Sequence, residues 1–284
     1  MVKTIEVQDV LITPRRRDSH KGDYGKVYVI GGCENYIGAP YFCALSALKS
    51  GAGVVTLAVP RVFLPYYADK ATCGYTLDYL PDDGKHAVFD EEKAASVAAK
   101  ADVIAIGCGM GNNAETRKYV EYFLRNYTGV LVVDADGINA VSAAPQALED
   151  AKCKVILTPH VGEFKRLLPG WNGKPEQAEA FAKGYNVVLA VKSAVTYITD
   201  GTETYSNSTG TPAMAKGGSG DVLCGMVAAF AAVYPPLEAT KRACYFAGKA
   251  GEAAAQKAGN ELSLTPLDLI EAQAQVFGEY SKKE

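Results

Sequence analysis

The sequence lacks an excess of positive charge. Its 29 Lys and Arg residues stand against 32 Asp and Glu residues, which leaves a formal net charge of -3. Because nucleic-acid binding draws much of its affinity from basic groups that neutralise phosphates, this balance argues against a nucleic-acid partner. The one basic run, residues 15–17, is followed at once by Asp18, and we interpret it as a solvated arm.

A long apolar run is also missing. The longest, from Met226 to Tyr234, is too short to cross a bilayer. Charges at Lys3, Glu6 and Asp9 occupy the stretch where a signal peptide would have its apolar core. These absences predict a cytoplasmic protein without a membrane partner.

The cysteines lack any pattern typical of disulfides or metal ligands. There are seven, an odd number, and the sequence has no C-x-x-C pair and no histidine at metal-ligand spacing from them. Most lie in apolar stretches such as 222–226, where Cys is a small core residue. We therefore expect free thiols in a reducing compartment, assign none of them a catalytic role and predict no direct set of protein ligands for a metal.

What the sequence does have is the composition of a globular protein: 284 residues, 48% hydrophobic and 21% charged. No stretch rich in Pro, Ser or like charges divides it, so we expect a single domain over residues 1–284. Short β-rich runs alternate with helical patterns, which predicts an α/β/α sandwich of three layers with a mostly parallel central sheet. Strands are expected at 26–30, 54–59, 103–106, 130–133, 155–157 and 187–191, and helices at 40–49, 91–100, 115–126, 221–233, 237–258 and 266–280.

A hairpin is expected near residue 200. The β-rich runs 196–199 and 202–205 flank Asp200-Gly201, a dipeptide that tolerates the positive φ angles of a type I′ turn. The pattern predicts an antiparallel edge to the sheet.

The most informative segment is Gly217-Gly218-Ser219-Gly220-Asp221, at the start of an apolar helix. Glycines let backbone N–H groups point outward together, and a helix N-terminus favours negative charge, so the segment predicts a phosphate site. Asp221 is then a base beside the phosphate, or alternatively a plain helix N-cap. Two known motifs do not fit. In a Walker A loop the lysine follows the glycines, whereas Lys216 precedes them, and in a nucleophile elbow a glycine stands two residues after the serine, where this chain has Asp221.

Two further polar segments, 134–139 and 158–163, follow expected strands, at the end of the sheet where open α/β proteins bind ligands. His160 is either a buried structural histidine or a residue that faces a ligand. The carboxylates of the first segment either hold Mg²⁺ through water or cap the next helix, and capping is favoured for Asn139. We associate Mg²⁺ with Asp134, Asp136 and Glu163.

Together these segments resemble the NAD(P)H-hydrate dehydratase family, a branch of the ribokinase-like superfamily, over nearly the whole chain. The matching stretches are His20-Lys-Gly-Asp-Tyr-Gly-Lys-Val, Gly31-Gly32, Ala47-Leu-Lys-Ser-Gly-Ala-Gly53, Gly107-Cys-Gly-Met-Gly111, Asp134-Ala-Asp-Gly, Thr158-Pro-His-Val-Gly-Glu and Met214-Ala-Lys-Gly-Gly-Ser-Gly-Asp221.

The resemblance implies a ribokinase-like fold and a cofactor-repair activity, in which (S)-NAD(P)H-hydrate is dehydrated to NAD(P)H. ADP is the expected phosphoryl donor, with ATP as the other option, and Mg²⁺ assists. Asp221 would take the proton of the ring hydroxyl as that oxygen attacks the terminal phosphoryl group, and phosphate would then leave. The hydrated dinucleotide would contact Ala39, Gly109, His160 and Asp221, and the nucleotide would contact Lys192, Ser193, Ala194, Val195, Thr196, Gly218, Ser219 and Gly220.

Three positions depart from the family pattern: Ser193 stands for a usual Gly, Lys216 for a usual Thr and Ala247 for a usual His. The fused epimerase domain of some relatives is not found in the chain, so the resemblance implies a functional pairing with a separate NAD(P)H-hydrate epimerase. It also implies a homo-oligomer, with a tetramer as one option. Two alternatives stay open: a ribokinase-like kinase of a vitamin precursor, and an inactive nucleotide-binding protein.

Overall fold

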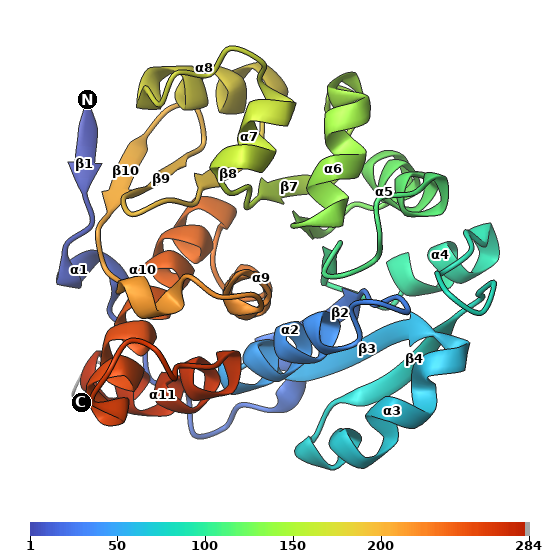
Figure 1. The fold of residues 1–284 in the computed structure, drawn as a ribbon, viewed down its shortest axis with the longest axis horizontal. Helices are drawn as coiled ribbons and strands as arrows, with labels where there is room; N and C mark the ends of the chain where they lie inside the picture. Colours follow the sequence, from blue (N-terminus) through green and yellow to red (C-terminus); the bar gives the residue numbers. More distant parts are fainter. Residues whose placement is uncertain (282–284) are drawn as a thin grey trace.

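The computed structural model describes residues 1–281, and its ten strands form one sheet in the order β1-β10-β9-β8-β7-β6-β5-β2-β3-β4 (Figure 1). Strand β9 is antiparallel to both of its neighbours, and all other pairings are parallel. The strands are β1 Val2–Thr4, β2 Lys26–Ile30, β3 Val54–Pro60, β4 Thr76–Leu80, β5 Val103–Ile106, β6 Val130–Val133, β7 Lys154–Leu157, β8 Val188–Val191, β9 Thr196–Thr199 and β10 Thr204–Asn207.

Helices cover both faces of this sheet. Figure 1 shows α2, α9, α10 and α11 together on one side and α4 to α8 on the other. The helices are α1 Val7–Val10, α2 Gly38–Lys49, α3 Leu64–Ala68, α4 Glu91–Ala98, α5 Ala114–Asn126, α6 Asp136–Ala143, α7 Val161–Leu167, α8 Pro175–Tyr185, α9 Ser219–Ala231, α10 Pro236–Ala258 and α11 Pro266–Glu279.

The central strands are apolar on both faces because each face supports its own core. Val103 and Ala105 of β5 pack towards α2 and α9, whereas Ile104 and Ile106 pack towards α5 and α6. All four of these side chains are buried. Continuous aliphatic runs of this kind are typical of parallel strands between two helical layers, so the sandwich predicted from the sequence is confirmed.

The predicted strands and helices are present, with ends shifted by a few residues. The prediction does not include two strands, β1 and β4, which form the two edges of the sheet. Strand β10 is therefore not an edge strand, because β1 pairs with its outer side.

The expected type I′ turn is wrong. Thr199 pairs with Thr204, so the connection holds four residues instead of two. Only Gly201 in it has a positive φ, of 84°. The Asp200 carboxylate accepts the backbone N–H groups of residues 202 and 203 at 2.8 Å each, which stabilises the longer turn.

Within residues 1–281, no helix is long and apolar enough to span a membrane.

Candidate active site at the carboxyl ends of the central strands

Three polar residues each directly follow one of three neighbouring parallel strands. Asp134 follows β6, Thr158 follows β7 and Lys192 follows β8. The Thr158 hydroxyl donates to Asp134 Oδ1 at 2.8 Å, and Lys192 Nζ donates to the same oxygen at 2.7 Å. The carboxyl ends of the strands thus bring a charged pair together from residues far apart in the chain.

The ion pair between Lys192 and Asp134 is almost enclosed. The Asp134 side chain is 2% exposed and that of Lys192 is 19% exposed. Burial opposes the charge on Lys192, but the nearby carboxylates of Asp134 and Glu163 outweigh it and raise its pKa above the usual value. Lys192 is therefore a protonated amine with a fixed position in the site.

The N-terminus of α9 faces this pair. Gly218 is its N-cap, with a φ of 98° that favours glycine. Gly220 has room for no more than a small group on its inner side, since a β-carbon there would lie 3.4 Å from Lys192 Nζ and 3.7 Å from Asp134 Oδ2. Free N–H groups, the helix dipole and the Lys192 ammonium thus converge on one spot, which is an arrangement that binds anions.

Asp221 is the third residue of α9, so the N-cap alternative is wrong: the helix begins two residues earlier, after Gly218. One oxygen of Asp221, one oxygen of Asp134 and the sulfur of Cys108 all lie within 4.8 Å of one another. Burial, and then the negative charge of Asp134, raise the pKa of Asp221 to about 7, while Cys108 and Lys192 act in the opposite direction. A carboxyl group with this pKa can both take up and release a proton near neutral pH.

His160 is half exposed and caps α7 with its ring. Its Nδ1 accepts the N–H groups of Gly162 and Glu163 at 2.9 and 3.2 Å, and Glu163 in return accepts the His160 N–H at 2.8 Å. Its side chain is 56% exposed, so it is not a buried core histidine. Glu163 is buried beneath it, and that burial raises the pKa of its carboxyl group.

The segment after Asp134 is held in an unusual turn. Ala135 has a φ of 48°, uncommon outside glycine, immediately before α6. Asp136 accepts the Gly111 N–H at 2.8 Å, which ties this turn to the loop after β5. Asn139 does not cap α6 as expected, since it lies inside the helix and accepts from the Arg166 side chain at 3.0 Å.

The candidate Mg²⁺ carboxylates are not gathered around one point. Among residues 1–281, the groups of three side chains whose ligand atoms lie within 4.8 Å of one another do not include the set Asp134, Asp136 and Glu163. Asp136 and Glu163 are each occupied by backbone N–H groups, whereas Asp134 Oδ2 faces Gly220.

The remaining candidate residues lie on the loops around this centre. A β-carbon on Gly109 would lie 3.1 Å from the Ala39 side chain, so these two residues are neighbours. The segment from Lys192 to Thr196 begins beside Pro159, whose carbonyl accepts the Lys192 N–H at 2.8 Å, and its residues 193–195 are exposed. The Ser193 hydroxyl donates to the Val195 carbonyl, so it is turned into its own loop.

The other two residues that depart from the family pattern, Lys216 and Ala247, contact neighbours outside the group formed by Asp134, Thr158 and Lys192. Lys216 donates from Nζ to the Leu262 carbonyl and so links the glycine segment to the loop before α11. Ala247 is buried in the apolar core beside the sheet. Neither residue forms a hydrogen bond with the Asp134 and Lys192 side chains.

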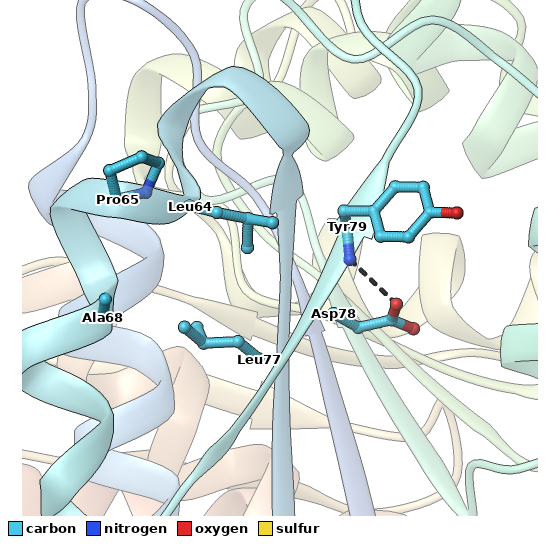
Figure 2. Close-up of a pocket in the computed structure, with 6 residues that line it drawn as sticks. All are labelled: Leu64, Pro65, Ala68, Leu77, Asp78 and Tyr79. Carbon is cyan, nitrogen blue, oxygen red and sulfur yellow. Dashed lines mark hydrogen bonds between the residues drawn. The ribbon is translucent and has the colours of Figure 1, made fainter.

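A cavity of about 460 Å³ lies elsewhere, between α3 and the edge strand β4 (Figure 2). Its lining is mostly apolar, from Leu64, Pro65, Ala68 and Leu77, with Asp78 and Tyr79 at one side. It contains none of the residues that the sequence predicts for the site.

Thr158 and Cys108 belong to the site, but the sequence reasoning did not assign them roles. Thr158 could have been recognised from the sequence as a site residue, because it directly follows a predicted strand, as Asp134 does. Cys108 looked like a core residue, and only the sheet order brings it to Asp221.

Comparison with known sequences identifies relatives over almost the whole chain. A family profile described as NAD(P)H-hydrate dehydratase matches residues 27–275. The bifunctional NAD(P)H-hydrate repair enzyme Nnr of Pyrobaculum aerophilum is 37% identical over 94% of this chain and 53% of that protein. The ADP-dependent (S)-NAD(P)H-hydrate dehydratase of Cenarchaeum symbiosum is 33% identical over 96% of this chain and 95% of that protein. The chain thus spans about half the length of the bifunctional relatives.

Solved structures share the fold. A ribokinase-like superfamily protein of Enterococcus faecalis superimposes with a TM-score of 0.84 at 24% identity, over 99% of this chain and 97% of that one. The ADP/ATP-dependent NAD(P)H-hydrate dehydratase of Bacillus subtilis, co-crystallised with ATP and Mg²⁺, gives 0.82 at 24% identity over 99% of both chains. The ribokinase-like fold expected from the sequence is confirmed.

Proposed function

The chain belongs to the NAD(P)H-hydrate dehydratase family, and from this premise we propose that it dehydrates (S)-NAD(P)H-hydrate to NAD(P)H at the expense of ADP or ATP. The observation that carries the proposal is the position of Asp221. A carboxyl group with a pKa of about 7 lies on the first turn of α9, beside the glycine segment and next to Lys192. A base and an anion site are what phosphoryl transfer to a hydroxyl group requires.

In the proposed reaction, Asp221 takes the proton of the hydroxyl group on the hydrated nicotinamide ring. The oxygen attacks the terminal phosphoryl group of the nucleotide, so that an O–P bond forms as the bond to the leaving nucleotide breaks. Hydroxide is a poor leaving group and phosphate a good one. The electron pair of the ring nitrogen then expels phosphate, the neighbouring ring carbon loses a proton, and the reduced ring is restored.

Charge develops on the phosphoryl oxygens in this step, and two groups of this chain can hold it. The N–H groups of Gly218 and Gly220 lie at the positive end of the α9 dipole, whereas the Ser219 N–H donates to the Lys216 carbonyl at 3.4 Å, and the Lys192 ammonium is within reach of Gly220. Asp134 and Thr158 keep that ammonium in place through one shared carboxylate oxygen. Such fixed groups stabilise the transition state without reorganising during the reaction.

We assign the two substrates to the two sides of Asp221. Ala39, Gly109 and His160 would contact the hydrated dinucleotide, and the segment from Lys192 to Thr196 would contact the nucleotide together with residues 218–220. The half-exposed ring of His160 and the partly exposed Ala39 support the first assignment, because a ligand can reach both, and Gly109 packs directly against Ala39. The exposed residues 193–195 support the second.

Mg²⁺ fits this site through Asp134 alone. Its Oδ1 accepts from Thr158 and Lys192, while Oδ2 points to the spot beside Gly220 where we expect phosphate. A carboxylate oxygen that is free on one side suits a hydrated Mg²⁺ held partly by the substrate phosphates. When bound, the ion would supply further neutralisation of phosphate charge. Asp136 and Glu163 would influence it only indirectly, since their carboxylates hold backbone N–H groups.

A separate NAD(P)H-hydrate epimerase is the partner that this function would need, because an (S)-specific enzyme cannot use the other epimer. The bifunctional naming of the Pyrobaculum aerophilum relative supports this pairing of activities. We also propose a homo-oligomer, with a tetramer to be tested by light scattering.

The first experiment follows near-ultraviolet absorbance after the protein is mixed with hydrated NADH, Mg²⁺ and either ADP or ATP, with phosphate release measured in the same sample. We expect a rise with one nucleotide and an equal amount of free phosphate. No rise and a stable phosphate ester of a different hydroxylated compound would instead support a small-molecule kinase. Nucleotide binding without either product would support an inactive binding protein.

A further inference from the structure

Three cysteine side chains from separate elements meet beneath the first turns of α9. Cys43 lies on α2, Cys108 follows β5 and Cys224 lies on α9. Their sulfur atoms all lie within 4.8 Å of one another, and each residue is at most 1% exposed. We call these residues the sulfur triad. Their spacing along the chain matches no metal motif, and only the fold brings them together.

The geometry of the sulfur triad suits a single metal ion. Sulfur atoms at about 2.3 Å from one tetrahedral ion lie about 3.8 Å from each other. Separations within 4.8 Å therefore need shifts of about 1 Å or less to reach that arrangement. Small rotations of three cysteine side chains supply shifts of this size, whereas the backbones of α2 and α9 are held in close contact at Gly225, where a β-carbon would lie 2.1 Å from the Cys43 carbonyl oxygen.

The sulfur triad adjoins the candidate active site. Cys108 belongs both to the triad and to the second group of close ligand atoms, with Asp134 and Asp221. Asp221 and Cys224 are three residues apart on α9 and so lie on the same face of the helix. An ion among the sulfur atoms would therefore be next to the proposed base.

We propose that Cys43, Cys108 and Cys224 form a binding site for one thiophilic d¹⁰ metal ion, of the class of Zn²⁺ and Cd²⁺. The ion displaces thiol protons and is held by the resulting thiolates, which are the preferred ligands of such ions. Core packing alone accounts for each cysteine singly, but it does not account for three sulfur atoms converging on one point beside two carboxylates.

Occupation of the sulfur triad would also affect turnover. Three thiols that lose their protons to one dication change the charge of the triad from zero to −1, and a negative charge beside Asp221 would raise the pKa of its carboxyl group further and keep it protonated, so that it could not take the hydroxyl proton. This consequence rests on the proposed function, whereas metal binding itself does not.

The test is a Cd²⁺ titration of the full chain, first treated with chelator and a phosphine reductant, and followed by the sulfur-to-metal charge-transfer absorption. We expect one equivalent to bind to the wild-type protein. Cys73→Ser and Cys244→Ala should bind it equally well, because Cys73 is exposed and Cys244 is buried in α10 outside the triad. Cys43→Ala and Cys224→Ala should each lose at least tenfold in affinity, with thermal melts to show that they remain folded.

The proposal is overturned if the wild-type protein gives no charge-transfer band, or if folded Cys43→Ala binds Cd²⁺ as tightly as wild type. If Cys224→Ala does not fold, Cys43→Ala carries the comparison, because it leaves α9 unchanged. A parallel assay with Zn²⁺ measures turnover: one equivalent should slow the wild-type protein and not Cys43→Ala. If no dehydratase activity exists, the absorbance result still decides whether the metal site does.

Discussion

At the scale of single residues, the site depends on charges that are costly to bury singly. Asp221, Asp134 and Lys192 each come from a different element; Asp134 raises the pKa of both other groups, and Lys192 acts to lower that of Asp221. The glycine segment before α9 predicted Asp221 as a site residue, whereas Lys192 was expected in the site from the family resemblance alone. The sequence did not reveal that Thr158 fixes Asp134, because that hydrogen bond joins residues 24 apart that meet only across the sheet.

Replacing Asp221 by Asn should abolish turnover while nucleotide binding is largely kept. The amide fills the same space but cannot take the hydroxyl proton, so we expect a loss of roughly 10²–10⁴-fold in kcat. Stopped assays of NADH formation give kcat, and calorimetry with ADP or ATP gives the affinity. Near-normal turnover in a folded variant would exclude Asp221 as the base, and a melt at the same pH controls for unfolding.

Replacing Lys192 by Met should destabilise the protein by about 3–5 kcal/mol, because it leaves the Asp134 carboxylate buried without its partner. The double variant with Asp134→Asn should recover much of that loss, since no charge is then unpaired. Urea unfolding of the two single variants and the double variant measures the coupling. Strict additivity would mean that the pair contributes no interaction energy. Turnover should be low in all three.

At the scale of elements, the inner strands were predictable and the edges were not. Strands β5 and β6 are continuous aliphatic runs, which need no knowledge of their neighbours to be recognised. Strand β4 alternates weakly, and the three residues of β1 are all exposed, so each is a strand only because a partner pairs with it. The helix α9 was expected to begin at Asp221, and two more residues join it because Gly218 supplies a left-handed N-cap.

The glycine segment before α9 offers a matched pair of variants. At Gly218, φ is 98° and a β-carbon would lie 2.4 Å from Pro266 Cγ, whereas a β-carbon at Gly217 would meet nothing within 4 Å. Gly218→Ala should therefore cost about 1–3 kcal/mol and reduce the rise in Tm that ADP or ATP produces. Gly217→Ala should change neither by more than about 0.5 kcal/mol. Thermal melts with and without nucleotide measure both the stability and the rise in Tm on nucleotide binding. Equal changes in the Gly218→Ala and Gly217→Ala variants would contradict this account of the loop.

At the scale of the whole molecule, the sequence predicted three layers but not how the strands are ordered within the sheet. Alternating strand and helix patterns indicate the sandwich, because each crossover must cover a face of the sheet. They do not tell which strand lies beside which, so the group of residues at the ends of β5, β6, β7 and β8 could be recognised only in the structure. A single domain over residues 1–284 stays a prediction that limited proteolysis can test.

The layer that supports Asp221 depends on close contact between α2 and α9. A β-carbon on Gly225 would lie 2.1 Å from the Cys43 carbonyl oxygen, so Gly225→Ala should push the helices apart and destabilise the protein by about 1–3 kcal/mol or more. The control is Gly278→Ala in α11, where nothing lies within 4 Å and the alanine should stabilise the helix by up to about 1 kcal/mol. Urea unfolding measures both, and a neutral Gly225→Ala would show that the two helices can separate freely.

The pairing of β1 with β10 has a consequence for the order in which the molecule is assembled during synthesis. Lys3 of β1 contacts Glu203, which is 200 residues further along the chain. A ribosome must therefore finish β10 before β1 has anything to pair with, whereas β2, β3 and β4 find each other among neighbours in sequence. Pairings across so long a separation form slowly, because a large loop has to close first. One edge of the sheet is thus completed by the strand that is synthesised before all the others in the sheet, and until it pairs, the outer side of β10 is open to chaperones and to other nascent chains.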